Sequence, residues 1–479
     1  MDETSLQVAE GLLAAAPCSV TLPAGTGKTQ LVATAAALAG GEGQRSLILT
    51  HTNAGVDAIR RRLRLLGVPA ASTRVETLAS WAFALTRSYP GIAGVMTPAV
   101  PNWADSNVYV QGAIAVAHAR ALREVMRHSF GYLLVDEYQD CSALQHKFVL
   151  ALGAGIEKTV VFGDPLQAIF TFGGPMASWE DDVAAAFPGH RVPTYPHRWA
   201  GHNRDLGEWL LQLRALLQTG ATFDITTHDV PGLRFVTNSD PTTLPRVAQG
   251  FTSPTESVVL LDKWAPDVAR HAGRLNGRFL VMEDIGARFM HEHLAQLPDE
   301  GDPSVAHWLA TFAKDCGTGL GQLDRPVLER LAQHQGVAHY RREGITDILQ
   351  ALDRLVQNPT YQELSAATEV MYRNHTLKLY RREAWRDTCE AIRLSAGSDF
   401  SAVDMLHQVR DRLRRTGRGP ENRIASRTLL VKGLEYDHVV IADLGNFADP
   451  CNLYVALSRA RKTITIVGRS PRVLLRTGA

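Results

Sequence analysis

The stretch Leu22-Pro23-Ala24-Gly25-Thr26-Gly27-Lys28-Thr29 decides how the chain folds. It follows an apolar run from Ser19 to Leu22 and leads into the segment Gln30 to Ala39, which predicts a buried strand, a glycine turn and a helix. In such a turn, backbone N–H groups and the positive end of the helix dipole converge on a polyphosphate. Glycine lets the backbone approach phosphate because it has no Cβ. We therefore expect a phosphate-binding loop.

Two side chains of this loop have expected roles in binding a nucleotide. Lys28 is expected to contact the β- and γ-phosphates and Thr29 to bind Mg²⁺, and the close backbone contacts come from Ala24, Gly25, Thr26 and Gly27. The common pattern GxxxxGKT begins with glycine, whereas Leu22 occupies that place here. A glycine-rich turn that holds no ligand is the alternative interpretation.

Length and composition limit the classes of protein. At 479 residues the chain is too long for one ordinary core, so several domains are expected. The 50 Lys and Arg residues nearly balance the 49 Asp and Glu residues, so a nucleic-acid surface has to be a local basic patch. Five cysteines without CxxC spacing fit a reducing compartment. The acidic start at Asp2 and Glu3, together with the short apolar runs, predicts a cytoplasmic protein without a membrane segment.

Short apolar runs separated by helical segments predict an α/β protein with doubly wound parallel sheets. Besides the strand before the phosphate loop, the expected strands are 46–50, 132–135 and 158–162 in the first half, and 257–261, 278–282, 427–431, 438–442 and 463–467 in the second. The first α/β domain is expected to comprise residues 1–84 and 128–195, with an insertion at 85–127. The second is expected to comprise residues 196–287 and 396–479, with a helical insertion at 288–395.

An acidic pair follows the expected strand 132–135, in the order Asp136-Glu137-Tyr138-Gln139-Asp140. Open parallel sheets bind ligands at the carboxyl ends of their strands, so these carboxylates are expected beside the phosphate loop. Asp136 is suited to hold Mg²⁺, and Glu137 to accept a proton from the water that attacks a γ-phosphate. For a single Asp-Glu pair a helix N-cap is the more common role. Together with the phosphate loop, the pair indicates hydrolysis of a nucleoside triphosphate.

Another strand end carries Gln167, which is placed to sense a γ-phosphate. Phe170 and Phe172 nearby either stack on unpaired bases or lie in the core. By themselves, Arg198 and Arg459 would be lone cations. Only the motifs around them suggest a functional role.

Basic runs at Arg60 to Arg64 and Arg410 to Arg418 are able to grip phosphates, although a solvated helix face is the commoner role. Trp81, Trp199 and Trp264 are expected in the core rather than as stacking platforms.

The ordered set of motifs resembles the UvrD/PcrA/Rep branch of superfamily 1A DNA helicases. The stretch Asp136 to Asp140 is similar to the family's DExxQD signature, and Gly163 to Phe170 is similar to its GDxxQxIY motif. The remaining matches are the phosphate loop to motif I, Thr50-His51-Thr52-Asn53 to motif Ia, Val75 to Leu78 to the next DNA-contact motif, Arg198 to motif IV, Val431 to Asp437 to motif V, and Tyr454 to Arg459 to motif VI.

The resemblance implies two RecA-like lobes, each with an insertion, with ATP and Mg²⁺ bound between the lobes and single-stranded or tailed DNA crossing both. It implies that Gln167, Arg198 and Arg459 contact the γ-phosphate, the two arginines from the second lobe. The further residues that it implies are Gly433 and Glu435 for the nucleotide, Gln7 for adenine (with a solvent-facing helix residue as the alternative), and Thr52, Asn53, Thr77, Phe170 and Phe172 for DNA.

Two departures from the family pattern weaken the case for strand unwinding. Leu429 replaces a histidine ahead of motif V, and Pro196-His197 replaces Asn-Tyr in motif IV. The sequence thus predicts an ATP-dependent motor on single-stranded DNA, with 3′ to 5′ polarity taken from the family. The alternative is a helicase-like regulatory ATPase that controls a partner nuclease. That alternative follows from a resemblance to the compact helicase-like subunit of the Gabija anti-phage system, GajB, whose partner would be an OLD-type, GajA-like nuclease.

Overall fold

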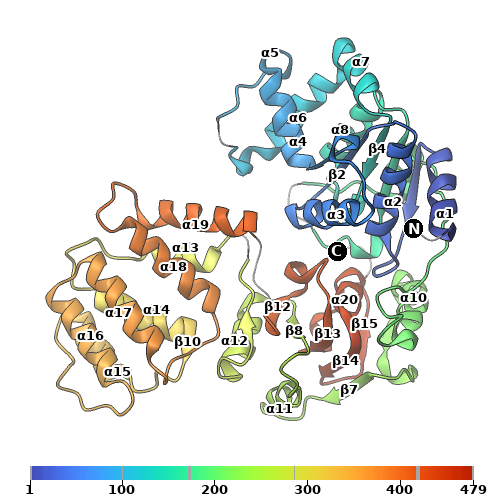
Figure 1. Cartoon of the computed structure of the whole chain (residues 1–479). Helices are drawn as coiled ribbons and strands as arrows, with labels where there is room; N and C mark the ends of the chain where they lie inside the picture. The colour runs from blue at the N-terminus through green and yellow to red at the C-terminus, as the bar shows by residue number, and fades with distance from the viewer. Residues whose placement is uncertain (1–2, 100, 171–173, 285, 417–420, 477–479) are drawn as a thin grey trace. The chain divides into compact units, whose positions relative to one another are not determined.

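The computed structural model describes residues 3–99, 101–170, 174–284, 286–416 and 421–476 (Figure 1). The chain divides into two compact units. The first comprises Met1–Ala221, Asp449–Ser458 and Leu474–Ala479, and the second comprises Thr222–Ala448 and Arg459–Val473.

A five-stranded parallel sheet forms the centre of the first unit, in the order β1-β5-β4-β2-β3. Its strands are almost entirely apolar at the centre of the sheet, as expected for a parallel sheet that is covered on both faces. The strands are β1 (Cys18–Thr21), β2 (Ser46–Thr50), β3 (Thr73–Thr77), β4 (Tyr132–Val135) and β5 (Thr159–Gly163).

Helices cover both faces of this sheet because successive strand residues point to opposite sides. Ile48 and Leu134 pack with α1, α2 and α3 on one face, and Leu47 and Leu133 pack with α4, α6, α7 and α8 on the other. The helices of the unit are α1 (Glu3–Ala14), α2 (Lys28–Gly41), α3 (Asn53–Leu65), α4 (Leu78–Ser88), α5 (Pro90–Ala93), α6 (Ser106–His118), α7 (Arg120–Ser129), α8 (Ala143–Gly153), α9 (Ala184–Ala186), α10 (Arg204–Gln218) and α20 (Pro450–Leu457). The predicted doubly wound α/β fold is confirmed.

The boundaries of this unit differ from those expected from the sequence. The segment 85–127, expected as an insertion, contributes α6 and α7 to the same core as α8, with Val110 and Met126 buried near Phe148. Helices α10 and α20 also belong to the first unit, although the sequence assigned both to the second domain. Local patterns predict a helix but do not show which sheet it packs against.

The second unit contains a six-stranded parallel sheet in the order β7-β14-β13-β8-β12-β9. Its core is formed by the sheet with α11 (Thr243–Gln249) and α12 (Ala265–Arg274). The strands are β7 (Leu233–Thr237), β8 (Val258–Asp262), β9 (Leu280–Val281), β12 (Arg423–Arg427), β13 (Tyr436–Ile441) and β14 (Ala460–Gly468), and the short strands β6 (Thr222–Asp224) and β15 (Arg472–Leu474) form a separate pair.

Two strands of the second sheet were not predicted correctly. The strand expected at 427–431 ends at Arg427, and Thr428–Val431 forms a short 3₁₀ turn instead. The strand pattern was missed because the apolar centre of β12 is short and is flanked by the charged residues Arg423 and Arg427. The edge strand β7 was not predicted at all, because its residues are only partly buried and have no continuous apolar run.

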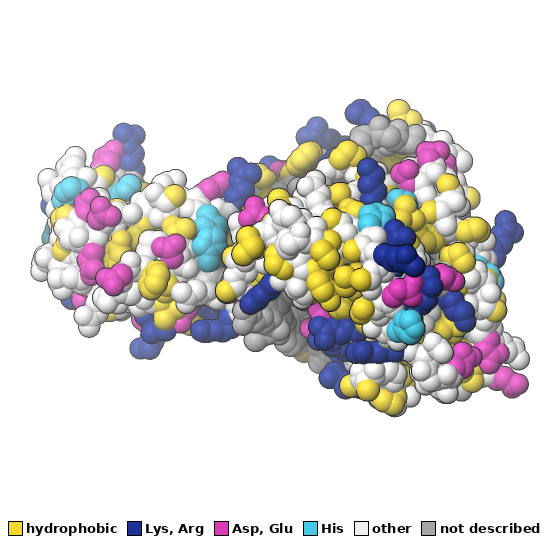
Figure 2. Space-filling view, turned by 90° about the horizontal axis from the view of Figure 1, so that it is seen from above, with side chains coloured by type: hydrophobic (Ala, Val, Ile, Leu, Met, Phe, Trp, Pro, Cys, Tyr) yellow, Lys and Arg dark blue, Asp and Glu magenta, His cyan; other side chains and the backbone are white. Residues whose placement is uncertain are grey.

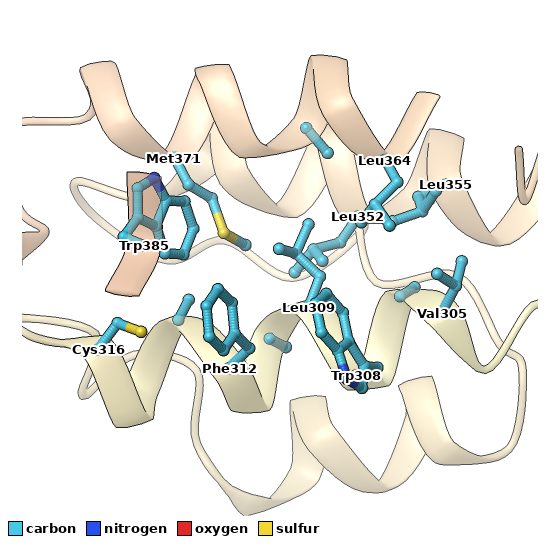
Figure 3. Close-up of a cluster of buried hydrophobic side chains, with 14 of the residues drawn as sticks. Val305, Trp308, Leu309, Phe312, Cys316, Leu352, Leu355, Leu364, Met371 and Trp385 are labelled. Carbon is cyan, nitrogen blue, oxygen red and sulfur yellow. The ribbon is translucent and has the colours of Figure 1, made fainter. Parts of the chain in front are cut away.

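A mainly helical body follows β9 within the second unit (Figure 3). Its core contains three stacked aromatic rings. The Phe312 ring centroid lies 5.2 Å from that of Trp308 and 5.5 Å from that of Trp385, with interplanar angles of 14° and 9°. The elements are α13 (Arg288–Leu294), α14 (Val305–Cys316), β10 (Gly317–Thr318), α15 (Arg325–Ala332), α16 (Thr346–Gln357), α17 (Tyr361–Arg373), β11 (Lys378–Leu379), α18 (Arg382–Ser395) and α19 (Ala402–Thr416). The body extends past residue 395, where the sequence placed its end, because Leu406 of α19 is part of the same core.

Arg410 on α19 is buried and ion-paired, although the sequence offered it as a phosphate-gripping or solvated arginine. Its guanidinium lies 2.9 Å from the Asp387 carboxylate, also contacts Glu383, and donates to the backbone carbonyl of Asp284 at 2.7 Å. The pair thus joins α18 and α19 to the segment after β9.

Basic and acidic side chains are interspersed on the face shown in Figure 2, in keeping with the net charge of +1. Among the described residues, no helix has both the length and the apolar character that crossing a bilayer requires.

The buried ion pair predicts a large effect of Arg410→Met on stability. Removing the guanidinium leaves the buried Asp387 carboxylate paired only with Arg386, whose side chain is mostly exposed, and breaking a buried pair costs about 3–5 kcal/mol. We expect urea unfolding, followed by tryptophan fluorescence because Trp308 and Trp385 lie in this body, to shift to lower urea concentration. Arg393→Met removes an exposed pair with Glu390 on α18 and serves as the control, with little or no change expected. Equal effects of the two substitutions would contradict this role.

Candidate functional site

The phosphate loop joins β1 to α2, and its backbone requires glycine at two positions. Gly25 and Gly27 have φ of 73° and 91°, in the left-handed region that L side chains rarely adopt. The loop packs against a later segment of the same unit, because a Cβ on Gly25 would lie 2.7 Å from the ring of the fully buried Trp199. Thr26 closes the turn by donating its hydroxyl to the carbonyl of Pro23 at 2.8 Å.

Lys28, the first residue of α2, is paired with the acidic end of β4. Its Nζ lies 2.8 Å from Oε1 of Glu137 and 3.6 Å from Oδ1 of Asp136. Lys28 and Asp136 are both buried, and Glu137 is partly exposed. The structure therefore brings together the loop lysine and the two carboxylates that the sequence proposed as partners.

Burial and charge act in opposite directions on this pair. Burial raises the pKa of Asp136 to about 6, although the Lys28 charge pulls it down. For Lys28, burial favours the neutral amine, but the charges of Glu137 and Asp136 outweigh it and raise the pKa above its ordinary value. Lys28 is therefore a permanently charged ammonium at physiological pH, as a phosphate-binding group must be.

Glu137 is held in an unusual backbone conformation. Its φ of 57° is left-handed, which is uncommon for a residue with a side chain and often marks a functional position. Its backbone N–H donates to Oδ1 of Asp136 at 2.9 Å, and its carboxylate accepts a hydrogen bond from the amide of Gln139. The carbonyl oxygen of Gln139 in turn accepts from the backbone N–H of Asp164 at 2.9 Å. Gln139 thus orients Glu137, a role that the sequence reasoning did not assign to it.

Asp164 follows β5 and is fully buried. It accepts from the side-chain amide of Gln167 at 2.9 Å and forms two hydrogen bonds with Arg214, at 2.8 and 2.9 Å. Arg214 lies on α10 outside every motif, so the sequence contained no signal for it. The Arg214 guanidinium lies 5.0 Å from the ring centroid of Tyr454, whose hydroxyl accepts from the backbone N–H of Ala24 at 3.2 Å.

Arg198 lies in the same unit as the phosphate loop, although the sequence placed it in the second lobe. Its backbone N–H donates to the carbonyl of Gly25 at 3.1 Å, and its guanidinium donates to the carbonyl of Ser458. The resemblance to the helicase motifs implied that Arg198 belongs to the second lobe. In the structure, the next residue, Trp199, packs against Gly25, and this contact keeps Arg198 beside the phosphate loop.

The other residues proposed to contact the nucleotide are divided between the two units. Arg459 belongs to the second unit, where it is buried and donates to the carbonyl of Leu434 at 3.3 Å. Gly433, with φ of 84°, and Glu435 are exposed in the same loop before β13. Gln7 is exposed on α1, as either an adenine contact or a solvent-facing residue would be. Their roles stay predictions.

Residues proposed to contact DNA lie at the carboxyl ends of the neighbouring strands β2 and β3 of the first sheet. Thr50 and Thr77 are partners in the parallel register, so Thr52 and Asn53 lie near the end of β3. Thr52 and Thr77 are also N-caps, accepting from the backbone N–H of Gly55 and Ser80 at 3.0 Å each. A structural role thus accounts for both hydroxyls, and Thr77 is buried.

The aromatic residues divide into buried and exposed ones. Phe170 is half-buried, and Phe172 lies outside the described residues. Trp199 is fully buried as predicted, but the prediction for Trp264 is wrong, because its side chain is 55% exposed after β8.

In the first basic run, Arg60 donates to the carbonyl of Val75 and Arg62 donates to Gln30, so these two arginines are engaged within the unit.

The residues proposed for Mg²⁺ fit that ion. Magnesium takes one or two protein oxygen ligands and fills its remaining positions with water and substrate phosphate. Asp136 is a buried carboxylate at the strand end, and Thr29 follows Lys28 in the first turn of α2. Hydroxyl and carboxylate oxygens are therefore both available beside the phosphate loop.

The fold, and the loop lysine beside an acidic strand end, have the arrangement of the P-loop class. A family comparison narrows the class, because residues 108–178 match the model for the UvrD/REP helicase N-terminal domain. That stretch contains the acidic strand end and the segment with Asp164 and Gln167, so the resemblance to UvrD-type helicases is confirmed. Among solved structures, the chain is similar to Pif1 helicase from Candida albicans, with 12% identity and a TM-score of 0.41 over 98% of this chain and 94% of that chain. No curated protein matches the sequence.

The close packing of the loop predicts a cost for Gly25→Ala. The new methyl group would meet Trp199 and the Cβ of Arg198 in a left-handed backbone, and overpacking of this kind costs about 1–3 kcal/mol. We expect a lower thermal midpoint and weaker binding of a fluorescent ATP analogue. The control is Gly11→Ala on the exposed side of α1, where a Cβ meets nothing within 4 Å. That change is expected to stabilise the helix by about 0.5–1 kcal/mol, and a loss of stability there as large as in Gly25→Ala would contradict the packing argument.

Proposed function

We propose that the protein is an ATP-dependent DNA motor of the UvrD type. In this proposal, ATP hydrolysis drives translocation along single-stranded DNA in the 3′ to 5′ direction. The observation that carries it is the contact of Lys28 with Glu137 and Asp136, which unites a phosphate loop with a candidate base and a candidate metal ligand. The family match over residues 108–178 supports the choice of a helicase among P-loop proteins.

Each candidate residue has a separate task in the proposed reaction. Lys28 binds the β- and γ-phosphates, exchanging its carboxylate contacts for phosphate oxygens. Glu137, held by Gln139, accepts the proton of the attacking water. Gln167, Arg198 and Arg459 are proposed to contact the γ-phosphate and stabilise the charge that develops on it.

Asp136 and Thr29 are the proposed holders of Mg²⁺, which supplies neutralisation of phosphate charge when it is bound. The low exposure of Asp136 restricts the water around this position, so that its charge interacts more strongly with a nearby cation than it would in water.

The proposed DNA contacts belong to a different part of the same edge. Thr52 and Asn53 at the start of α3 and Thr77 at the start of α4 lie at the carboxyl ends of neighbouring strands. Backbone N–H groups at two helix N-termini suit contact with DNA phosphates. Phe170 is the proposed stacking residue, and Phe172 is proposed on the sequence alone.

Glu137→Gln tests the proposed base. The amide keeps the shape of the side chain but cannot accept the proton, so we expect ATP binding to persist while DNA-stimulated hydrolysis falls by about 100-fold or more. Phosphate release is measured with and without single-stranded DNA. Glu157→Gln, an exposed carboxylate paired with Arg127, is the matched control and should keep wild-type hydrolysis.

Wild-type turnover in Glu137→Gln would refute the role of Glu137, and absence of hydrolysis in the wild type with any DNA would refute the motor. Strand displacement on 3′-tailed and 5′-tailed duplexes then tests unwinding and polarity. DNA-stimulated hydrolysis without displacement of either duplex would favour the regulatory alternative over the helicase.

A further inference from the structure

A buried ion pair joins Asp164, within the helicase-like motif at 163–170, to Arg214, which lies outside every motif. Arg214 reaches from α10 to Asp164 and donates two hydrogen bonds, from Nη1 to Oδ2 at 2.9 Å and from Nη2 to Oδ1 at 2.8 Å. Asp164 is fully buried and the Arg214 side chain is 12% exposed. A two-point contact of this kind fixes the plane of the carboxylate as well as its charge.

Asp164 is the point where several groups of the site meet. Its Oδ2 accepts from the amide of Gln167, and its backbone N–H donates to Gln139. Gln139 donates to Glu137, which pairs with Lys28. The orientation of the Asp164 carboxylate therefore bears on both the proposed γ-phosphate sensor and the proposed base.

Arg214 is also linked to the phosphate loop, through Tyr454. Its guanidinium lies 5.0 Å from the ring centroid of Tyr454, and the Tyr454 hydroxyl accepts from the backbone N–H of Ala24. Burial raises the pKa of Tyr454 to about 12, so its hydroxyl stays protonated. Arg214 thus contacts both Tyr454, which binds the phosphate loop, and Asp164, which is linked through Gln139 to the acidic end of β4.

We propose that Arg214 is a positioning residue for ATP hydrolysis, which acts through Asp164 to hold the carboxamide of Gln167 and, through Gln139, the carboxylate of Glu137. This inference rests on the proposed function and extends it to a residue that no motif contains. The two-point contact keeps Asp164 an acceptor. The amide of Gln167 must then direct its NH₂ group toward Asp164, which sets the direction of its carbonyl oxygen.

Without the guanidinium, the buried Asp164 carboxylate loses its ion-pair partner and both hydrogen bonds that fix its plane. The carboxylate can then turn, and the amide of Gln167 that donates to it turns with it. Lysine at position 214 restores a charge but has no fixed fork of donors, so it restores the ion pair without the plane of the carboxylate.

The test uses the full-length protein with single-stranded DNA and compares Arg214→Met, Arg214→Lys and the control Arg204→Met. Arg204 lies on the same helix in an exposed pair with Glu208. For Arg214→Met we expect kcat for ATP hydrolysis to fall about 10- to 100-fold, the range that a small misplacement of catalytic groups produces, with KM for ATP changed less than about threefold. Arg214→Lys should lie between Arg214→Met and the wild type, and Arg204→Met should match the wild type.

The outcomes separate this proposal from the proposed function. Wild-type kcat in either Arg214 variant overturns the positioning role while leaving the motor intact, whereas lack of turnover in the wild type contradicts both. If circular dichroism shows that Arg214→Met does not fold, Arg214→Lys takes its place in the test. Its kcat and KM are then compared with those of the wild type in the same way. A merely structural role predicts that kcat falls only in proportion to the folded fraction, and that result would also overturn the proposal.

Discussion

A parallel sheet brings the carboxyl ends of all its strands to one edge, and the first unit depends on this constraint. The phosphate loop follows β1, the acidic pair follows β4, and Asp164 follows β5. Three segments that are distant in sequence therefore meet without any further device, and the salt bridge between Lys28 and Glu137 is the direct result. The same constraint places Thr52 and Thr77 beyond β2 and β3.

Much of this arrangement was predictable from local sequence. The strands near 46–50 and 132–135 have short, mainly apolar patterns and are fully buried, and the glycines and lysine of the loop have the spacing that is typical of a phosphate-binding turn. What was not predictable depends on contacts between distant segments. Arg214 and Asp164 are 50 residues apart, and nothing in the helix around Arg214 distinguishes it from a surface arginine. Trp199 and Gly25 meet in the same way.

Arginine shows this limit most clearly, because the same residue type is buried at some positions and exposed at others. Arg410 is buried against Asp387 and Glu383 in the helical body, where sequence reasoning expected a solvated or phosphate-binding side chain. Arg459 is buried as well, whereas Arg60 is an exposed residue on α3. Whether an arginine is buried or exposed is a property of the fold rather than of the motif.

The left-handed backbone at Glu137 has a consequence for the evolution of this chain. Holding a residue with a side chain at φ of 57° costs about 1–2 kcal/mol relative to glycine. Backbone strain by itself would therefore favour glycine at position 137, and the proposed role of the carboxylate in turnover gives a reason for keeping it. In a lineage that kept the fold as a binding scaffold and abandoned hydrolysis, this position should be among the first to drift toward glycine or asparagine, while the buried pair of Arg214 and Asp164 would persist longer.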